Sequence, residues 1–340
     1  ILVDEFQDTN FIQNKWLNLL VNKNENICCV GDDDQSIYSW RGAEIKNFLT
    51  FDHIYKNCKV FKLEQNYRST KNILETASNL ISHNNGRVEK KLWSSAQQGE
   101  KVKLNCYQTG REEAEAVSDI AENKLKNKYS LNNVAILVRA IYQTREFEER
   151  FLKVGLGYRV LGGTKFYERS EVKDAVAYLR IINQKYDDLA LERVIGSPRR
   201  GIGESTLNQL HIFGSQNKLC LEDSIKKNLE NDSLKPKMKT SLAQLTRLID
   251  KWRLDSKTNK HYDLLKIVLD ESGYSEMLKN KKDLENENRL ENIKELLRAM
   301  HDYDNMQSFL EHVALATSID KEWEGEKINL MTMHAAKGLE

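Results

Sequence analysis

The sequence has 340 residues, 40% of them hydrophobic, which is enough for two or three packed units rather than one core. The 52 basic and 51 acidic residues nearly cancel, which excludes a surface that is basic throughout, so any phosphate-binding surface must be local. No apolar run approaches the ~20 residues that span a bilayer, so we expect no membrane partner.

Short apolar runs alternate with stretches of helical spacing in the first half of the chain. The runs predict strands at residues 1–3, 27–30, 60–63, 102–106 and 134–138. The spacing predicts helices at residues 16–20, 71–83, 112–126 and 139–154. Continuous apolar strands are typical of a parallel sheet covered on both faces, so this alternation indicates a doubly wound α/β architecture.

The pattern changes between about residues 170 and 320, where strand signals vanish. Amphipathic helices follow one another there, with breaks at residues 201–203, 231–233 and 255–260. Residues 328–332 then return to strand character. We therefore expect a mostly helical unit inserted into the second α/β unit.

The five cysteines form no Cys-x-x-Cys pair, and no histidine stands at zinc-ligand spacing. Reduced thiols and a cytoplasmic location are the expectation. The chain opens Ile-Leu-Val-Asp-Glu without an initiator Met or a signal peptide. We interpret it as a piece of a longer polypeptide.

Two carboxylates, Asp4 and Glu5, follow the first expected strand. At the end of a strand, one carboxylate can hold Mg²⁺ and the second can orient or deprotonate an attacking water. The alternative is an ordinary solvated strand end.

Residues 31–43 follow the second expected strand and combine a glycine, three aspartates, a glutamine, two aromatic residues and an arginine. Tyr38 and Trp40 beside Arg41 suit stacking on unpaired bases, whereas core packing is the alternative. The three aspartates lack the spacing and the closing glutamate of an EF-hand.

A Gly-x-Gly turn at residues 201–203 follows Arg199 and Arg200 and opens an expected helix. Backbone N–H groups at such a turn can bind phosphate with help from the helix dipole. The alternative is a capping turn with exposed charge.

Four segments resemble helicase motifs II, III, IV and V of superfamily 1, in the family order: residues 4–8, 31–43, 63–70 and 331–340. The chain is thereby identified as similar to the UvrD/Rep/PcrA family. The resemblance implies RecA-like parallel-sheet (P-loop NTPase) domains with a mostly helical inserted domain. It implies a first RecA-like domain at residues 1–62, a second at 63–160 and again at 324–340, and the helical insert at 161–323.

The resemblance also implies a set of nucleotide-site residues. They are Asp4 for Mg²⁺, Glu5 for water activation, Gln35 as γ-phosphate sensor, Tyr67 on adenine, Arg68 as arginine finger, and Glu340 at the ribose.

A second implied set contacts DNA. It comprises Tyr38, Trp40 and Arg41 on single-stranded bases, Thr332 and His334 on the backbone, and Arg199, Arg200, Gly201, Gly203 and Thr206 on duplex phosphates. Residues 162–169 resemble the family segment near the junction of single and double strands, which adds Phe166. Phe166 and Tyr167 could equally be core residues.

The implied function is an ATP-dependent 3′–5′ DNA helicase or translocase in DNA repair or replication restart. It uses ATP and Mg²⁺ and acts on single-stranded and tailed duplex DNA. No Gly-x-x-x-x-Gly-Lys-[Ser/Thr] occurs in the sequence, and the family places this P-loop upstream of Asp4 and motif VI downstream of Glu340. We therefore expect that this chain alone hydrolyses ATP inefficiently and that turnover requires the P-loop segment.

Two alternatives remain open at this point. The chain could be a non-catalytic DNA-binding remnant or regulatory module that keeps the duplex grip without the motor. It could also belong to a helicase–nuclease, although no metal-binding nuclease motif is visible in the sequence.

Overall fold

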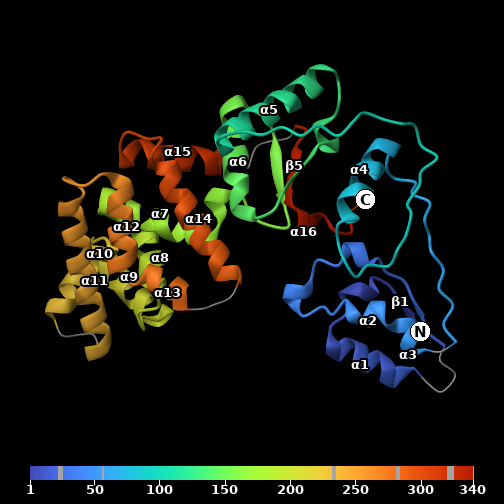
Figure 1. The fold of residues 1–340 in the computed structure, drawn as a ribbon. Helices are drawn as coiled ribbons and strands as arrows, with labels where there is room; N and C mark the ends of the chain where they lie inside the picture. Colours follow the sequence, from blue (N-terminus) through green and yellow to red (C-terminus); the bar gives the residue numbers. More distant parts are fainter. Residues whose placement is uncertain (22–25, 56, 232–234, 281–283, 320–324, 340) are drawn as a thin grey trace. The chain divides into compact units, whose positions relative to one another are not determined.

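The computed structural model describes residues 1–21, 26–55, 57–231, 235–280, 284–319 and 325–339. The chain forms two compact units, residues 1–106 and residues 107–340 (Figure 1). Within the described ranges, no helix has both the length and the apolar character needed to cross a membrane. The expected boundary between residues 62 and 63 falls inside the first unit, and the family domain boundaries stay predictions.

The first unit is built on two short parallel strands, β1 (Leu2–Val3) and β2 (Cys28–Cys29), which pair in register. Its helices are α1 (Phe11–Leu20), α2 (Lys46–Leu49), α3 (Phe51–Ile54) and α4 (Lys71–Ile81). Its 3₁₀ turns are η1 (Phe6–Asp8), η2 (Asp33–Gln35) and η3 (Ser39–Arg41). Helix α1 begins with a capping box between Asn10 and Gln13, so two backbone N–H groups of its first turn have partners.

The strands expected at residues 60–63 and 102–106 are wrong, because neither segment belongs to a strand. Leu63 is 87% exposed, so its side chain does not enter a core. An apolar run becomes a strand only where a neighbouring strand satisfies its backbone N–H and C=O groups.

The second unit contains a three-stranded parallel sheet in the order β3–β5–β4. Its strands are β3 (Ala135–Val138), β4 (Tyr158–Leu161) and β5 (Ile328–Thr332), with β5 in the centre. Helices α5 (Gly110–Lys126) and α6 (Thr144–Val154) pack together beside it (Figure 1). Phe147 and Phe151 of α6 share one buried cluster with Ile328 and Leu330, which joins helix to sheet.

The helical block lies between β4 and β5 in the sequence, as the loss of strand signals predicts (Figure 1). Its helices are α7 (Ser170–Asn183), α8 (Asp188–Gly196), α9 (Glu204–Asn217), α10 (Leu221–Glu230), α11 (Pro236–Asp255), α12 (His261–Glu271), α13 (Tyr274–Asn280), α14 (Leu284–Met300) and α15 (Met306–Ile319). They enclose a hydrophobic core of their own, with Trp252 fully buried in it.

Strand β4 was not expected from the sequence, because its four residues follow a glycine-containing turn and carry only a short apolar signal. Its backbone nevertheless pairs with β5 from Tyr158↔Ile328 to Leu161↔Met331. The pairing joins the chain before the helical block to the chain after it, so the block is an insertion into the sheet unit.

Candidate active site and nucleic-acid interface

The paired carboxylates Asp4 and Glu5 lie directly beyond β1, and both are exposed. The Asp4 carboxylate accepts a hydrogen bond from the backbone N–H of Glu5 at 2.9 Å. Glu5 has a φ of 49°, in the left-handed region that a non-glycine residue adopts at a cost in energy. The strained turn therefore presents both carboxylates at the end of the strand, as the sequence predicts.

The next turn joins this carboxylate pair to the end of β2. The backbone N–H of Phe6 donates to the carbonyl of Val30 at 3.0 Å, so the chain after β1 stays beside the chain after β2. Parallel strands end at the same edge of their sheet, where ligands of open α/β sheets bind. The loop that starts at Gly31 thus begins next to the two carboxylates.

Gln7 connects these two loops, and sequence reasoning assigned it no role. Its side chain is fully buried, and its amide nitrogen donates to the Glu5 carboxylate at 2.5 Å. Its side-chain oxygen accepts the backbone N–H of Asp32 at 3.0 Å. A Cβ on Gly31 would come within 2.4 Å of that oxygen, so the close approach requires glycine there. Gln7 lies inside the first helicase-like segment, which is the one signal that could have found it.

Gln35 extends the same hydrogen-bond chain through Asp32. The side-chain nitrogen of Gln35 donates to one carboxylate oxygen of Asp32 at 2.8 Å. The other oxygen of Asp32 accepts the backbone N–H of Asp34 at 3.0 Å, which caps the 3₁₀ turn η2. Glu5, Gln7, Asp32 and Gln35 therefore form one connected series at the end of the sheet.

Two basic residues pair with the three aspartates of this loop. Lys90 pairs with all three, Asp32, Asp33 and Asp34, and Arg87 grips Asp34 with two N–H groups, at 2.9 and 2.5 Å. The Arg87 hydrogen bonds hold the pKa of Asp34 below its usual value, although burial opposes this. Burial alone lowers the pKa of Lys90, but its hydrogen bonds to the carboxylates outweigh burial and raise the pKa. The carboxylates lie close enough to hold a cation, and the two basic side chains offset two of their three negative charges.

The aromatic pair Tyr38 and Trp40 follows on the same loop, with ring centroids 6.5 Å apart. The guanidinium of Arg41 lies over both rings, 5.1 Å from Tyr38 and 4.6 Å from Trp40. Trp40 is 49% exposed, so its ring is not a core residue. The structure brings the three expected base-stacking residues together at the surface.

Tyr67 and Arg68 lie in an exposed turn just before α4. Tyr67 is 81% exposed, and its hydroxyl donates to the side chain of Gln65 at 2.9 Å. The Asn66 side chain accepts the backbone N–H groups of Arg68 and Ser69, at 3.1 and 2.8 Å. An Asx turn of this kind fixes the backbone that carries the two expected nucleotide contacts.

In the second unit, Thr332 ends β5 and begins the short helix α16 (Met333–Ala336). The Thr332 hydroxyl accepts the backbone N–H of Ala335 at 3.1 Å, so it caps α16. A Cβ on Gly162 would lie 2.9 Å from the Ala335 side chain, which places the turn after β4 against α16. His334 is half-buried on α16, whereas Glu340 lies outside the described residues.

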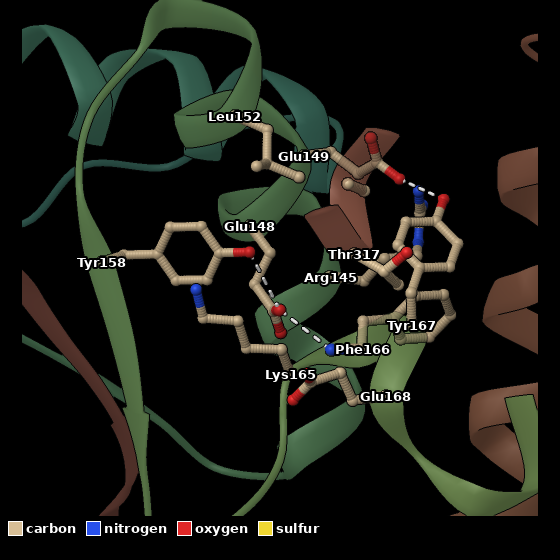
Figure 2. Close-up of a pocket in the computed structure, with 11 residues that line it drawn as sticks. Arg145, Glu148, Glu149, Leu152, Tyr158, Lys165, Phe166, Tyr167, Glu168 and Thr317 are labelled. Carbon is tan, nitrogen blue, oxygen red and sulfur yellow. Dashed lines mark hydrogen bonds between the residues drawn. The ribbon is translucent and has the colours of Figure 1, made fainter. Parts of the chain in front are cut away.

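Phe166 does not present a free ring face, because it is only 1% exposed. Figure 2 shows it in a small pocket with Glu148, Tyr158 and Tyr167. The buried Glu148 carboxylate accepts the Phe166 backbone N–H at 2.9 Å and the Tyr158 hydroxyl at 3.4 Å. Burial raises the pKa of Glu148, while the charge of nearby Arg169 opposes that rise. The packing supports the core alternative for Phe166 and Tyr167.

The Gly-x-Gly turn lies directly before α9, with Gly201 at a φ of 73° and Gly203 as the N-cap residue. Arg199 is exposed, but Arg200 points its guanidinium into the block. Arg200 donates to the carbonyl of Pro198 and to the hydroxyl of Tyr178, both at 3.0 Å. The two arginines therefore differ: Arg199 is available to phosphate, and Arg200 stabilises the turn. Thr206, in the first turn of α9, is half-buried.

The expected site residues thus fall into groups that each lie within one unit. The first unit carries Asp4, Glu5, Gln35, Tyr38, Trp40, Arg41, Tyr67 and Arg68, and the second carries Phe166, Arg199, Arg200, Gly201, Gly203, Thr206, Thr332 and His334. Sequence reasoning assigned no role to Gln7, Arg87 or Lys90. Gln7 lies inside the first helicase-like segment, whereas Arg87 and Lys90 stand far along the chain and belong to none of the four segments.

Comparison with known protein families shows matches along both parts of the chain. Residues 61–340 match the UvrD-like helicase C-terminal domain, and residues 1–56 match the UvrD/REP helicase N-terminal domain. A probable DNA helicase II homolog of Rickettsia felis is 42% identical over 343 residues, which cover 100% of this chain and 52% of that protein. The DNA helicase II of Rickettsia typhi is 43% identical with the same coverage.

An ATP-dependent DNA helicase PcrA of Staphylococcus epidermidis is 38% identical over 349 residues, covering 100% of this chain and 48% of that protein. The chain spans about half the length of these curated relatives. With both family matches in sequence order and every residue of the chain aligned to these helicases, the protein belongs to the UvrD-like DNA helicase family.

Proposed function

We propose that this chain supplies much of the motor and the duplex grip of an ATP-driven helicase that moves 3′ to 5′ along single-stranded DNA. The RecA-like arrangement of its α/β parts, and a role in DNA repair or replication restart, belong to the same proposal. The observation that carries it is the hydrogen-bond chain from Glu5 through Gln7 and Asp32 to Gln35. That chain physically connects a candidate water-activating carboxylate to a candidate γ-phosphate sensor.

Asp4 and Glu5 fit a site for a hard divalent cation and a water molecule. Both are exposed carboxylates at the end of a parallel strand, and oxygen ligands of this kind suit Mg²⁺. Bound Mg²⁺ would neutralise charge on the phosphate oxygens of ATP. In this proposal Asp4 holds the cation, and Glu5 orients or deprotonates the water, with Gln7 fixing the direction of its carboxylate.

Tyr67 and Arg68 suit the other end of the nucleotide. The exposed Tyr67 ring offers a stacking face to adenine, and a guanidinium can grip phosphate oxygens with two parallel hydrogen bonds. Both residues follow the Asx turn of Asn66, which limits how far they can move relative to α4. Arg68 would thus stabilise charge that develops on the phosphoryl group.

DNA contacts are proposed at three places. Tyr38, Trp40 and Arg41 would stack on unpaired bases, which every sequence offers to a moving motor. Thr332 and His334 would lie along the strand backbone. The exposed Arg199 and the N–H groups at the start of α9 would hold duplex phosphates.

A second candidate function is a DNA-binding module without turnover. It is favoured by the exposed Arg199 and the N–H groups at the start of α9, which could hold duplex phosphates without a nucleotide. Under this alternative the chain grips tailed duplex DNA independently of ATP.

The test is DNA-stimulated ATP hydrolysis by the protein expressed from its full reading frame, compared with its Glu5→Gln variant. We expect hydrolysis that rises with single-stranded DNA and falls at least about 100-fold in the variant. Unwinding of a 3′-tailed duplex, but not of a 5′-tailed duplex, would support the direction. Hydrolysis that persists in Glu5→Gln would overturn the assignment of Glu5, and DNA binding without any hydrolysis would favour the module.

A further inference from the structure

Residues 87–93 form a strap after α4 that touches the acidic loop at residues 32–35. The backbone N–H of Val88 donates to the carboxylate of Asp33 at 2.7 Å. The Lys90 ammonium lies 2.7 Å from Asp33 and 3.0 Å from Asp34, and it also pairs with Asp32. Backbone and side chains of the strap therefore hold the acidic loop together.

The same strap is bonded to the segment that carries Tyr67 and Arg68. The backbone N–H of Asn66 donates to the carbonyl of Trp93 at 2.7 Å, and the N–H of Trp93 donates to the carbonyl of Glu64 at 2.9 Å. The Glu64 carboxylate accepts the backbone N–H of Lys91 at 2.7 Å. One short strap thus bridges two loops that carry different parts of the proposed nucleotide site.

Lys90 matters most in this bridge because of its position relative to Gln35. One carboxylate oxygen of Asp32 faces Lys90, and the other accepts the Gln35 amide at 2.8 Å. The Lys90 side chain is only 15% exposed, so water screens these pairs weakly. Three adjacent carboxylates repel one another, so loss of Lys90 would weaken the position of Asp32 and with it the hydrogen bond that Asp32 accepts from the Gln35 amide.

We propose that Lys90 is a positioning residue that holds Gln35 through Asp32, and that the strap couples Gln35 to the turn bearing Tyr67 and Arg68. The proposal rests on the function proposed above. Lys90 touches carboxylates rather than the expected place of the nucleotide, so it acts through Gln35 and not on the reacting atoms. Binding at one loop can then change the other, because both are fastened to the same short segment.

The first test does not depend on activity. In the 340-residue chain, the side-chain amide resonance of Gln35 is compared between the parent and Lys90→Met by NMR, with assignment from Gln35→Ala. We expect Lys90→Met to shift this resonance and speed its hydrogen exchange. Lys91→Met is the matched control, since Lys91 is exposed and contributes only its backbone N–H to the strap contacts. An unchanged Gln35 resonance in a folded Lys90→Met overturns the proposal.

The second test is a double-mutant cycle on DNA-stimulated ATP hydrolysis by the protein from its full reading frame. We expect Lys90→Met to lower kcat about tenfold with KM for ATP within about twofold, and to have almost no further effect in a Gln35→Ala background. If Lys90 only stabilised the fold, Lys90→Met would lower kcat by the same factor in the parent protein and in the Gln35→Ala variant. That result overturns the proposal. If Lys90→Met does not fold, Lys90→Gln, which keeps a neutral amide NH2 as hydrogen-bond donor, takes its place in the cycle.

The two proposals can fail separately. A parent protein that folds and binds DNA but shows no hydrolysis refutes the proposed function, while the Gln35 resonance still decides the link to Lys90. A parent protein that hydrolyses ATP, with additive kcat losses, refutes the role of Lys90 alone.

Discussion

The side-chain oxygen of Gln7 accepts the backbone N–H of Asp32 at 3.0 Å across the ends of the two parallel strands β1 and β2. The other end of the same amide donates to Glu5 at 2.5 Å. A single buried side chain therefore fixes the distance between the carboxylate turn and the acidic loop. This amide therefore adds to the Phe6–Val30 backbone bond in holding the two loops beside each other.

Replacing Gln7 by alanine should loosen both loops at once. It leaves the backbone N–H of Asp32 without its acceptor, and an unsatisfied buried donor costs about 1–3 kcal/mol. We expect the free energy of unfolding of the first unit to fall by that amount, and DNA-stimulated kcat to fall about tenfold or more. Denaturant unfolding and steady-state ATP hydrolysis measure the two effects. Gln97→Ala, at an exposed glutamine of the same unit, should change neither.

Replacing Gly31 by alanine should cause the same defect as replacing Gln7, because the added methyl group displaces the Gln7 side chain. The new Cβ would lie 2.4 Å from the Gln7 side-chain oxygen and 2.9 Å from the Phe48 ring, so Gln7 must shift. Overpacking of this kind costs about 1–3 kcal/mol, and we expect the same loss of kcat as in Gln7→Ala. In the control Gly110→Ala, the nearest atom to the Cβ, in Glu146, is 3.4 Å away, so stability should stay nearly unchanged. A Gly31→Ala variant with the kcat of the parent protein would contradict the inference that Gln7 holds the two loops in place for activity.

Arg199 and Arg200 should separate DNA binding from stability. Arg199→Ala should weaken binding to a 3′-tailed duplex and reduce the salt slope of log K by about one, because one phosphate contact is lost. Arg200→Ala removes the bonds to Pro198 and Tyr178 and should lower stability by about 1–3 kcal/mol. Fluorescence anisotropy across a salt series and thermal unfolding distinguish the two. Equal effects of Arg199→Ala and Arg200→Ala on the salt slope would contradict the assignment of Arg199 to DNA binding and of Arg200 to stability.

Trp40 should contribute to single-strand affinity through stacking. Trp40→Ala should cost about 1–3 kcal/mol of binding to an unstructured oligonucleotide, the usual range for one stacked base. Trp16→Ala is the matched control, because Trp16 is also an exposed tryptophan of the first unit and lies on α1. Anisotropy with a labelled oligonucleotide measures both variants. A loss of the same size in both would mean that Trp40 has no specific role.

Asp34 should make the stability of the first unit depend on pH in the acid range. Its pKa in the folded protein is held below the usual 3.8, chiefly by hydrogen bonds from Arg87. The stabilisation is therefore fully present above pH 3.8 and is lost as pH falls through the lower folded-state pKa.

The measurement is the difference in unfolding free energy between the parent chain and Asp34→Asn, taken from pH 6 downward. We expect a constant difference at pH 5–6 that shrinks towards zero below about pH 4. Arg87→Gln should make this pH dependence smaller, because it removes the partner that lowers the pKa of Asp34 most, while Lys90 remains. A difference that grows on acidification would contradict the assigned sign.

Much of the fold can be read from local patterns. The helical spacing at residues 112–126 and the apolar run at 134–138 correspond to α5 and β3, and the loss of strand signals predicts the helical block. These patterns succeed because burial of one helix face, or of the strand side chains that face a helix, dictates which residues are apolar. The apolar run at residues 60–63 misleads, because only a neighbouring strand turns such a run into a strand.

The sequence by itself determined the family, the order of its motifs and the chemical type of each expected site residue, since carboxylates, aromatic rings and arginines have few alternative uses in those motifs. Only the tertiary structure decided how these residues are supported. It buried Gln7 between two loops, placed Lys90 against aspartates 58, 57 and 56 positions earlier in the chain, and turned Arg200 inward while leaving Arg199 exposed. Such contacts join residues far apart in sequence, and no local periodicity encodes them, because they depend on which surfaces meet when the chain folds.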